Sequence, residues 1–219
     1  MPNTVRMSNG GRSAGRRFDR DHGVTTQAIL FLSDLDPEMV GDAHAHATHY
    51  EAVPIADFHA LLKAVPEEEI RAATFVDIGA GMGRAILLAS GYPFRQVVGV
   101  EISPALHRIA QENVAAARSL RQRCRDLLVV RADARLWNYP AGNLVVFLYN
   151  PFDEVALAQS VGAVLHSRAL NERVYLLYHT PVHETSLAEF GLGEIARHAF
   201  GAVFATRSPE RRDLSASRY

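Results

Sequence analysis

Three glycines and two carboxylates are the residues of this sequence whose types and spacing point most directly to chemistry. Gly79, Gly81 and Gly83 follow an apolar run, and their lack of a Cβ lets the backbone turn sharply and approach a ligand. Asp77 precedes this glycine turn (residues 79–83), and Glu101 ends a second apolar run further along the chain. A carboxylate in that second position can hold the two hydroxyls of a ribose. The pattern therefore predicts a nucleoside-binding site.

The spacing and charge of the glycine turn argue against a dinucleotide. The dinucleotide fingerprint is G-x-G-x-x-G, whereas Arg84 stands here where the third glycine is expected. Asp77 would repel a pyrophosphate, whose binding depends on free N–H groups at the positive end of a helix. S-adenosylmethionine has no phosphate, and its sulfonium and ammonium groups suit an acidic turn. We therefore expect S-adenosylmethionine as the cofactor and disfavour a dinucleotide oxidoreductase.

The end of a later predicted strand adds a further motif. The run Leu148 to Phe152 reads Leu-Tyr-Asn-Pro-Phe, and together with the glycine turn and Glu101 it resembles the class I S-adenosylmethionine-dependent methyltransferases. The resemblance covers most of residues 18–207. It implies that Asp77 and the glycines face the methionine end of the cofactor and that Glu101 faces the ribose. It also implies that Asp133, at the end of the third strand, hydrogen-bonds the adenine amino group; the alternative is an N-cap on the following segment.

The resemblance also assigns the residues nearest to the reaction. In related enzymes with Asn-Pro-Pro-aromatic motifs, the Asn oxygen holds a target NH2 in line with the sulfonium methyl. By that resemblance Asn150 is catalytic and touches the cofactor, while Pro151 and Phe152 contact the substrate. This chain has a single proline there, which departs from the motif. The alternative is a turn, which Asn and Pro commonly form.

An upstream segment resembles a narrower group of small bacterial methyltransferases. Residues 18–26 and the element Tyr50-x-x-x-Pro54 match their preamble, and the latter is distantly similar to an element of histone-core-type protein lysine methyltransferases. By that analogy Tyr50 is a catalytic residue that lines the active site, and residues 24–55 form its lid. The alternative places Tyr50 in the core of a helical appendage.

Two groups of histidines have spacings that suggest metal binding. His44, His46 and His49 lie close together, and His179 and His183 are four residues apart. Neither group matches a zinc spacing with cysteine or carboxylate partners, so we expect no metal. We place His179 at a strand end near the cleft, where it is a candidate for substrate contact.

The elements that position these residues follow from hydrophobic patterning. Strands and helices alternate after residue 73, as in a doubly wound parallel sheet. We expect strands at 74–79, 96–101, 127–132, 143–149, 173–179, 193–199 and 202–207. We expect helices at 25–35, 55–65, 83–90, 104–122, 153–168 and 182–190. The fold class is therefore α/β, and the resemblance implies a Rossmann-like, seven-stranded, mostly parallel sheet whose last strand inserts antiparallel.

This pattern divides the chain into four parts. We expect a disordered basic tail over 1–22, a helical lid or appendage over 23–70, the methyltransferase domain over 71–208 and a flexible tail over 209–219. The ends are basic: residues 1–23 hold five arginines and two aspartates, and 207–219 hold four arginines and two acidic residues. Basic tails can bind nucleic acid or an acidic partner, but solvated disorder is the favoured interpretation.

Composition limits the possible number of domains, the redox compartment and any association with a membrane. The 219 residues fit one α/β domain with modest extensions. The single cysteine, Cys124, excludes an intrachain disulfide and fits a reducing compartment. No apolar run approaches the roughly 20 residues that span a bilayer, and the N-terminus lacks a signal-peptide core. We therefore expect a cytoplasmic protein without membrane contact.

These observations favour methyl transfer from S-adenosylmethionine to a nitrogen or oxygen. The acceptor is open between a protein lysine, a nucleic-acid base and a small metabolite, with a weak preference for protein. The alternative is a catalytically silent module for protein or RNA interaction. The oligomeric state cannot be read from the sequence.

Overall fold

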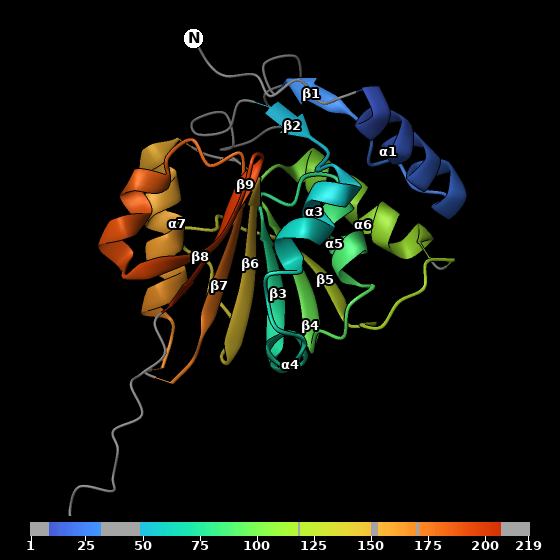
Figure 1. Ribbon diagram of the computed structural model, residues 1–219. Helices are drawn as coiled ribbons and strands as arrows, with labels where there is room; N and C mark the ends of the chain where they lie inside the picture. The colour runs from blue at the N-terminus through green and yellow to red at the C-terminus, as the bar shows by residue number, and fades with distance from the viewer. Residues whose placement is uncertain (1–8, 32–48, 118, 150–152, 170, 207–219) are drawn as a thin grey trace, which may run out of the picture.

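The computed structural model describes residues 9–31, 49–117, 119–149, 153–169 and 171–206. Seven strands form one sheet in the order β5-β4-β3-β6-β7-β9-β8 (Figure 1). Their bounds are β3 Ala73–Ile78, β4 Gln96–Glu101, β5 Leu127–Arg131, β6 Asn143–Tyr149, β7 Val174–His179, β8 Leu192–His198 and β9 Gly201–Thr206. β3 to β7 are parallel, and β9 runs antiparallel between β7 and β8. The predicted mostly parallel sheet with an inserted last strand is confirmed.

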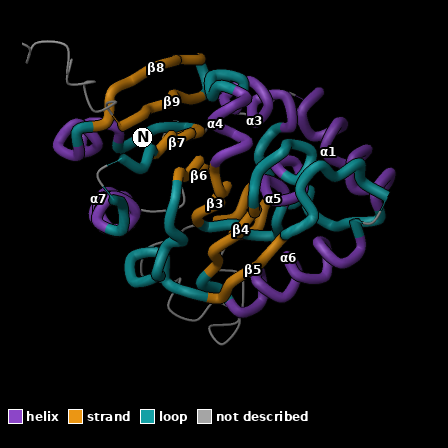
Figure 2. The backbone as a smooth tube through the Cα atoms, turned by 90° about the horizontal axis from the view of Figure 1, so that it is seen from below, coloured by secondary structure: helices purple, strands orange, loops and turns teal. Residues whose placement is uncertain are grey.

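Helices cover both faces of the sheet, as expected for a doubly wound fold. α3 (Ile55–Leu62), α5 (Arg84–Ala89) and α6 (Pro104–Ala116) lie on one face, and α7 (Glu154–His166) lies on the other (Figures 1 and 2). The 3-10 helix Glu184–Phe190 contacts α7, and the short α4 (Glu67–Ala72) leads into β3. β3 and β7 are buried at every residue because both of their faces are covered.

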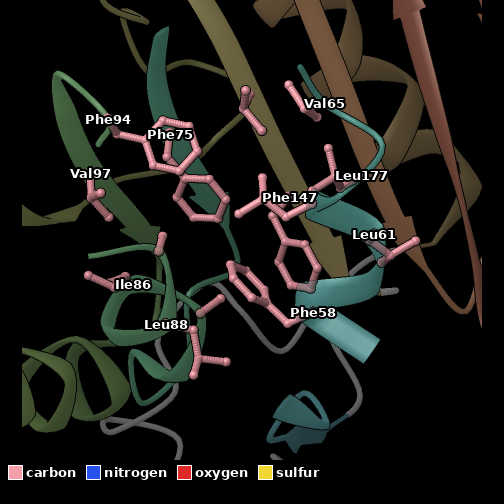
Figure 3. Packing of buried hydrophobic residues seen from close by; sticks show 14 of the residues in the cluster. Phe58, Leu61, Val65, Phe75, Ile86, Leu88, Phe94, Val97, Phe147 and Leu177 are labelled. Atoms are coloured by element: carbon pink, nitrogen blue, oxygen red, sulfur yellow. The ribbon is translucent and has the colours of Figure 1, made fainter. Parts of the chain in front are cut away.

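Aromatic residues dominate the core between α3 and the sheet. The fully buried Phe58 ring packs edge-on against Phe75 of β3 and Phe147 of β6, with ring centroids 5.9 and 5.4 Å apart (Figure 3). Leu61 and Leu177 extend this cluster toward β7. α3 is thus packed firmly on the sheet.

The order of the strands places the candidate site. The chain runs outward from β3 through β4 to β5 and then returns to the other side of β3 with β6. Ligands of such sheets bind at the carboxyl ends of the strands where this reversal occurs. Asp77 pairs with Gly99 of β4 and with Phe147 of β6, so it stands at that point.

The N-terminal part differs most from the prediction. Asn9–His22 forms a helix, α1, where a disordered tail was expected; Figures 1 and 2 place it on the side of the sheet that carries α5 and α6. Ile29–Phe31 forms a strand, β1, where a helix was expected over 25–35, and β1 pairs antiparallel with β2 (His49–Glu51). α1 is strongly polar, so its order depends on contacts with distant residues that its own pattern does not reveal.

Two further boundaries differ from the prediction. The helix predicted over 104–122 ends at Ala116, and the segment predicted as a helix over 182–190 is the 3-10 helix. Within the described ranges, no helix combines the length and apolar character needed to cross a membrane. The predicted tail over 209–219 lies outside the described residues.

Candidate functional site

The glycine turn lies at the carboxyl end of β3 and requires its glycines. Gly79, Gly81 and Gly83 have φ values of 75°, 55° and 85°, in the left-handed region that side chains with a Cβ disfavour. The Gly79 amide donates to the Val100 carbonyl at 2.9 Å, which ties the turn to β4. Arg84 then begins α5. The turn therefore brings backbone without Cβ atoms to the predicted ligand-binding edge, where Gly79 is exposed and Gly81 and Gly83 are buried.

Glu101 reaches back from the end of β4 to this turn. Its Oε2 accepts from the Gly81 amide at 2.7 Å, and its Oε1 accepts from the Ser103 amide at 2.8 Å. The side chain is only 5% exposed; burial raises its pKa, and these amide bonds oppose the rise. Glu101 thus shapes the turn itself, a role that the sequence did not indicate. Its two oxygens offer about four lone-pair positions, so further acceptor capacity remains for a ribose.

Asp77 is a buried carboxyl group beneath the turn. The residue is 4% exposed, and burial together with the nearby Glu101 carboxylate raises the pKa of Asp77 to about 8. Across the described residues, we find no hydrogen bond to this carboxyl group. Two buried acidic groups to which the described residues supply no cationic partner favour binding of a positive charge and disfavour a phosphate.

Tyr50 lies directly on the glycine turn. A Cβ added to Gly81 would fall well inside van der Waals distance of the Tyr50 ring. The Tyr50 hydroxyl donates to the Thr26 carbonyl at 2.7 Å, and burial raises its pKa. The ring also packs with Met82 and Leu106. The structure therefore brings Tyr50 to the candidate site, although its catalytic role stays a prediction.

The N-terminal segment is bonded to the sheet domain beside Tyr50. The buried Asn113 of α6 accepts from the Thr25 amide at 2.8 Å and donates to the Thr25 and Met82 carbonyls, each at 2.9 Å. Asp19 and Arg84 form a second, buried connection, with Arg84 Nη2 3.2 Å from Asp19 Oδ1. Sequence reasoning did not identify Asp19, Asn113 or Arg84 as site residues, because each partner lies far away in the chain.

A second group of polar side chains gathers at the ends of β6 and β7. The Tyr149 hydroxyl donates to Glu51 Oε2 at 3.1 Å, and the His179 Nε2 atom lies 3.1 Å from Asp57 Oδ2. The Tyr149 and His179 rings meet edge-on, with centroids 4.3 Å apart. Thr180 has φ 51°, rare for a β-branched residue, and its hydroxyl lies 3.0 Å from His179 Nδ1. His179 thus lies beside Tyr149, the last described residue before the predicted acceptor residues, with both ring nitrogens engaged.

The residues predicted to meet the acceptor follow Tyr149 directly. Asn150, Pro151 and Phe152 lie outside the described residues, so their catalytic, cofactor-binding and substrate-binding roles stay predictions. His44 and His46 also lie outside the described residues.

Asp133 is engaged in its own turn. Its carboxylate accepts from the Arg135 amide at 2.9 Å and forms an ion pair with the Arg135 guanidinium at 2.6 Å. The Leu136 amide donates to the Asp133 carbonyl at 3.0 Å. These bonds fit the alternative interpretation, in which Asp133 caps the segment that follows it. Its role toward adenine stays a prediction.

Comparison with known proteins identifies the fold. No family model matches the chain, and no curated protein sequence matches it. Among solved structures, the PH0226 protein from Pyrococcus horikoshii OT3 matches with a TM-score of 0.54 and 14% identity over 81% of this chain and 98% of that one. The ribosomal protein L11 methylase from Lactobacillus delbrueckii subsp. bulgaricus matches with a TM-score of 0.50 and 15% identity over 70% and 78%.

A third solved structure carries the cofactor in its name. The S-adenosylmethionine-dependent methyltransferase SibL matches with a TM-score of 0.51 and 15% identity over 68% of this chain and 54% of SibL. The matches cover 68–81% of this chain, whereas their sequence identities are only 14–15%. The chain therefore has the Rossmann-like fold of the class I S-adenosylmethionine-dependent methyltransferases.

Proposed function

We propose that this protein is a methyltransferase that binds S-adenosylmethionine against the glycine turn and transfers its methyl group to a nitrogen or oxygen. The observation that carries the proposal is Asp77, a buried carboxyl group with no hydrogen bond from the described residues, beside bare glycine backbone. A sulfonium and an ammonium group would supply the missing positive charge. The fold supports the same function.

The residues that fit the cofactor are those at the ends of β3 and β4. Asp77 would bind the cationic methionine end, the glycine backbone would let the cofactor approach closely, and Glu101 would accept from the ribose hydroxyls. The cofactor supplies an electrophilic methyl group, which an acceptor in line with the sulfur attacks directly. The protein then needs to orient the two partners and exclude water, and no covalent nucleophile is required.

The group around Tyr149 and His179 supports an amine as the acceptor. Glu51 and Asp57, which contact Tyr149 and His179, would present two carboxylates near the acceptor, and such groups attract a protonated amine. A lysine side chain has an unperturbed pKa of about 10.4, so it must lose a proton before it attacks. We place a protein lysine first among the acceptors. The alternative, a catalytically silent module, gives no reason for a buried, uncompensated acidic group at the turn.

A transfer assay tests this proposal. S-adenosylmethionine carrying a labelled methyl group is incubated with lysine-containing protein, with RNA and with extracts of small metabolites. We expect label in protein, and loss of that label with the Asp77→Asn variant. Binding of the cofactor without labelled product in any fraction would support the silent module instead.

Cofactor affinity is expected to rise with pH. Asp77 is protonated below its pKa of about 8 in the free protein, and a bound cation would lower that pKa, so binding releases a proton. The dissociation constant for S-adenosylmethionine should fall about tenfold between pH 6 and pH 7, while the ligand's ammonium stays charged.

Calorimetry in buffers of different ionisation enthalpy measures this proton directly. The uncharged nucleoside 5′-methylthioadenosine is the matched control ligand, because it lacks both the sulfonium and the ammonium. We expect its affinity to stay constant over the same range. Equal pH dependence for the two ligands would contradict the role of Asp77.

A further inference from the structure

A buried ion pair joins the N-terminal helix to the residue that follows the glycine turn. We propose that Arg84 and Asp19 are positioning residues for the cofactor site, because their pair fixes the Thr26 segment that holds the Tyr50 ring on Gly81. This inference rests on the proposed function. It adds α1 and residues 19–27 to the machinery that shapes the methionine end of the site.

Arg84 is unusual for a residue at the start of a helix that packs on a sheet. It is 2% exposed, and its guanidinium lies 5.0 Å from the Phe18 ring centroid. Nη2 donates to Asp19 Oδ1 at 3.2 Å, and Nε donates to the Thr26 hydroxyl. A buried guanidinium is costly unless it is paired, so this arrangement strongly favours one position of the N-terminal segment.

Asp19 organises that segment from within. Its carboxylate accepts from the Thr26 amide, the Thr26 hydroxyl and the Gln27 amide, each at 2.7 Å. Thr26 is fully buried, and its hydroxyl lies between Asp19 and Arg84. Asp19 therefore fixes both the backbone and the side chain of Thr26.

Thr26 links this fixed N-terminal segment to the candidate site. Its carbonyl accepts from the Tyr50 hydroxyl at 2.7 Å, and the Tyr50 ring covers Gly81. The Gly81 amide in turn donates to Glu101. A continuous series of contacts thus runs from α1 through Thr26 and Tyr50 to the turn. Loss of the ion pair would free the ring that bounds the methionine end.

The ordinary alternative is that the pair only stabilises the fold. The two hypotheses differ in what a conservative change does to cofactor affinity. Asp19→Asn removes the charge but keeps the shape, and Tyr50→Phe keeps the ring but removes its bond to Thr26. The control is Glu112→Gln, which breaks an exposed ion pair with Arg108 (2.7 Å) on the outer surface of α6.

Calorimetric titration with S-adenosylmethionine is the test. We expect Asp19→Asn to weaken binding about tenfold or more, Tyr50→Phe to weaken it less, and Glu112→Gln to leave it unchanged. The double variant Asp19→Asn/Tyr50→Phe should bind no more weakly than Asp19→Asn alone, because both changes break one series of contacts. Fully additive losses, or a lower melting temperature with unchanged affinity, would overturn the inference.

A second variant keeps the test decisive if Asp19→Asn does not fold. Arg84→Lys keeps a cation for Asp19 but loses the geometry that reaches Thr26, and it is expected to fold and to bind S-adenosylmethionine several-fold more weakly. Unchanged affinity in Arg84→Lys would contradict the role assigned to Thr26.

Hydrogen exchange separates failure of this inference from failure of the proposed function. If the wild-type protein binds no S-adenosylmethionine, the proposed function fails. The contact series is then judged in the ligand-free protein, where Asp19→Asn or Arg84→Lys should accelerate amide exchange at Tyr50 and Gly81. Unchanged exchange at both residues would overturn the inference independently of the cofactor.

Discussion

Replacing Asp77 with asparagine is expected to weaken S-adenosylmethionine binding by about 100-fold and to raise the melting temperature of the ligand-free protein. The carboxylate would face two cationic groups of the ligand, and charged hydrogen bonds of this kind contribute about 1.5–3 kcal/mol. A 100-fold loss corresponds to about 2.7 kcal/mol. Without the ligand, Asp77 is a buried acidic group that disfavours the folded state.

The pH dependence of the free energy of unfolding provides an independent test of the Asp77 prediction. The folded-state pKa of about 8 lies above the ordinary aspartate pKa of 3.8, so between these values the folded protein holds a proton that the unfolded chain has lost. The free energy of unfolding should therefore fall as the pH rises from about 4 to 8, and Asp77→Asn should flatten this slope. Each kcal/mol gained should raise the melting temperature by about 2–4 °C.

Matched controls make the Asp77 result specific. Asp21→Asn removes an exposed carboxylate that pairs with Arg20 at 3.6 Å, and neither affinity nor stability should change. Binding of 5′-methylthioadenosine should also survive in Asp77→Asn. A lower melting temperature in Asp77→Asn would show that this carboxyl group is structural.

Replacing Gly81 with alanine is expected to abolish cofactor binding and to destabilise the protein. The new Cβ would overlap the Tyr50 ring, and Gly81 has φ 55°, which costs a residue with a Cβ about 1–2 kcal/mol. Tyr50 can move only by breaking its bond to Thr26 and its contacts with Met82 and Leu106. We expect a total loss of about 2–4 kcal/mol, within the range for overpacked buried sites.

Gly191→Ala isolates the backbone contribution to this loss. Gly191 has φ 70°, and a Cβ added there would meet no atom within 4 Å. Thermal unfolding should therefore show a smaller shift for Gly191→Ala than for Gly81→Ala, and cofactor binding should be retained. Equal shifts in the two variants would argue against close packing of Tyr50 on the turn.

The sheet domain was predictable because the local sequence of each strand identifies it. Continuous apolar runs identified β3, β4 and β6 to within one residue at each end, and glycines marked the turn after β3. The antiparallel insertion of β9 came from the resemblance, since periodicity gives only the alternation of strands and helices. Asp77 and Glu101 were placed correctly at one edge because parallel strands bring their carboxyl ends together.

The N-terminal part was not predictable for the opposite reason. α1 is polar and rich in arginine, which in isolation is typical of a solvated tail. Its order depends on Asp19 meeting Arg84, 65 residues away, and on Thr25 meeting Asn113, 88 residues away. No local pattern encodes such pairs, and the same holds for His179 and Asp57, 122 residues apart.

Calorimetric titration with two nucleoside cofactors is the sharpest test of cofactor choice. The central claim is that an acidic glycine turn selects a cationic nucleoside over a phosphate-bearing one. Titration of the wild-type protein with S-adenosylmethionine and separately with NAD, at pH 7.5, compares the two. We predict saturable binding of S-adenosylmethionine and no heat of binding with NAD. Tight binding of NAD without a signal for S-adenosylmethionine would contradict the account.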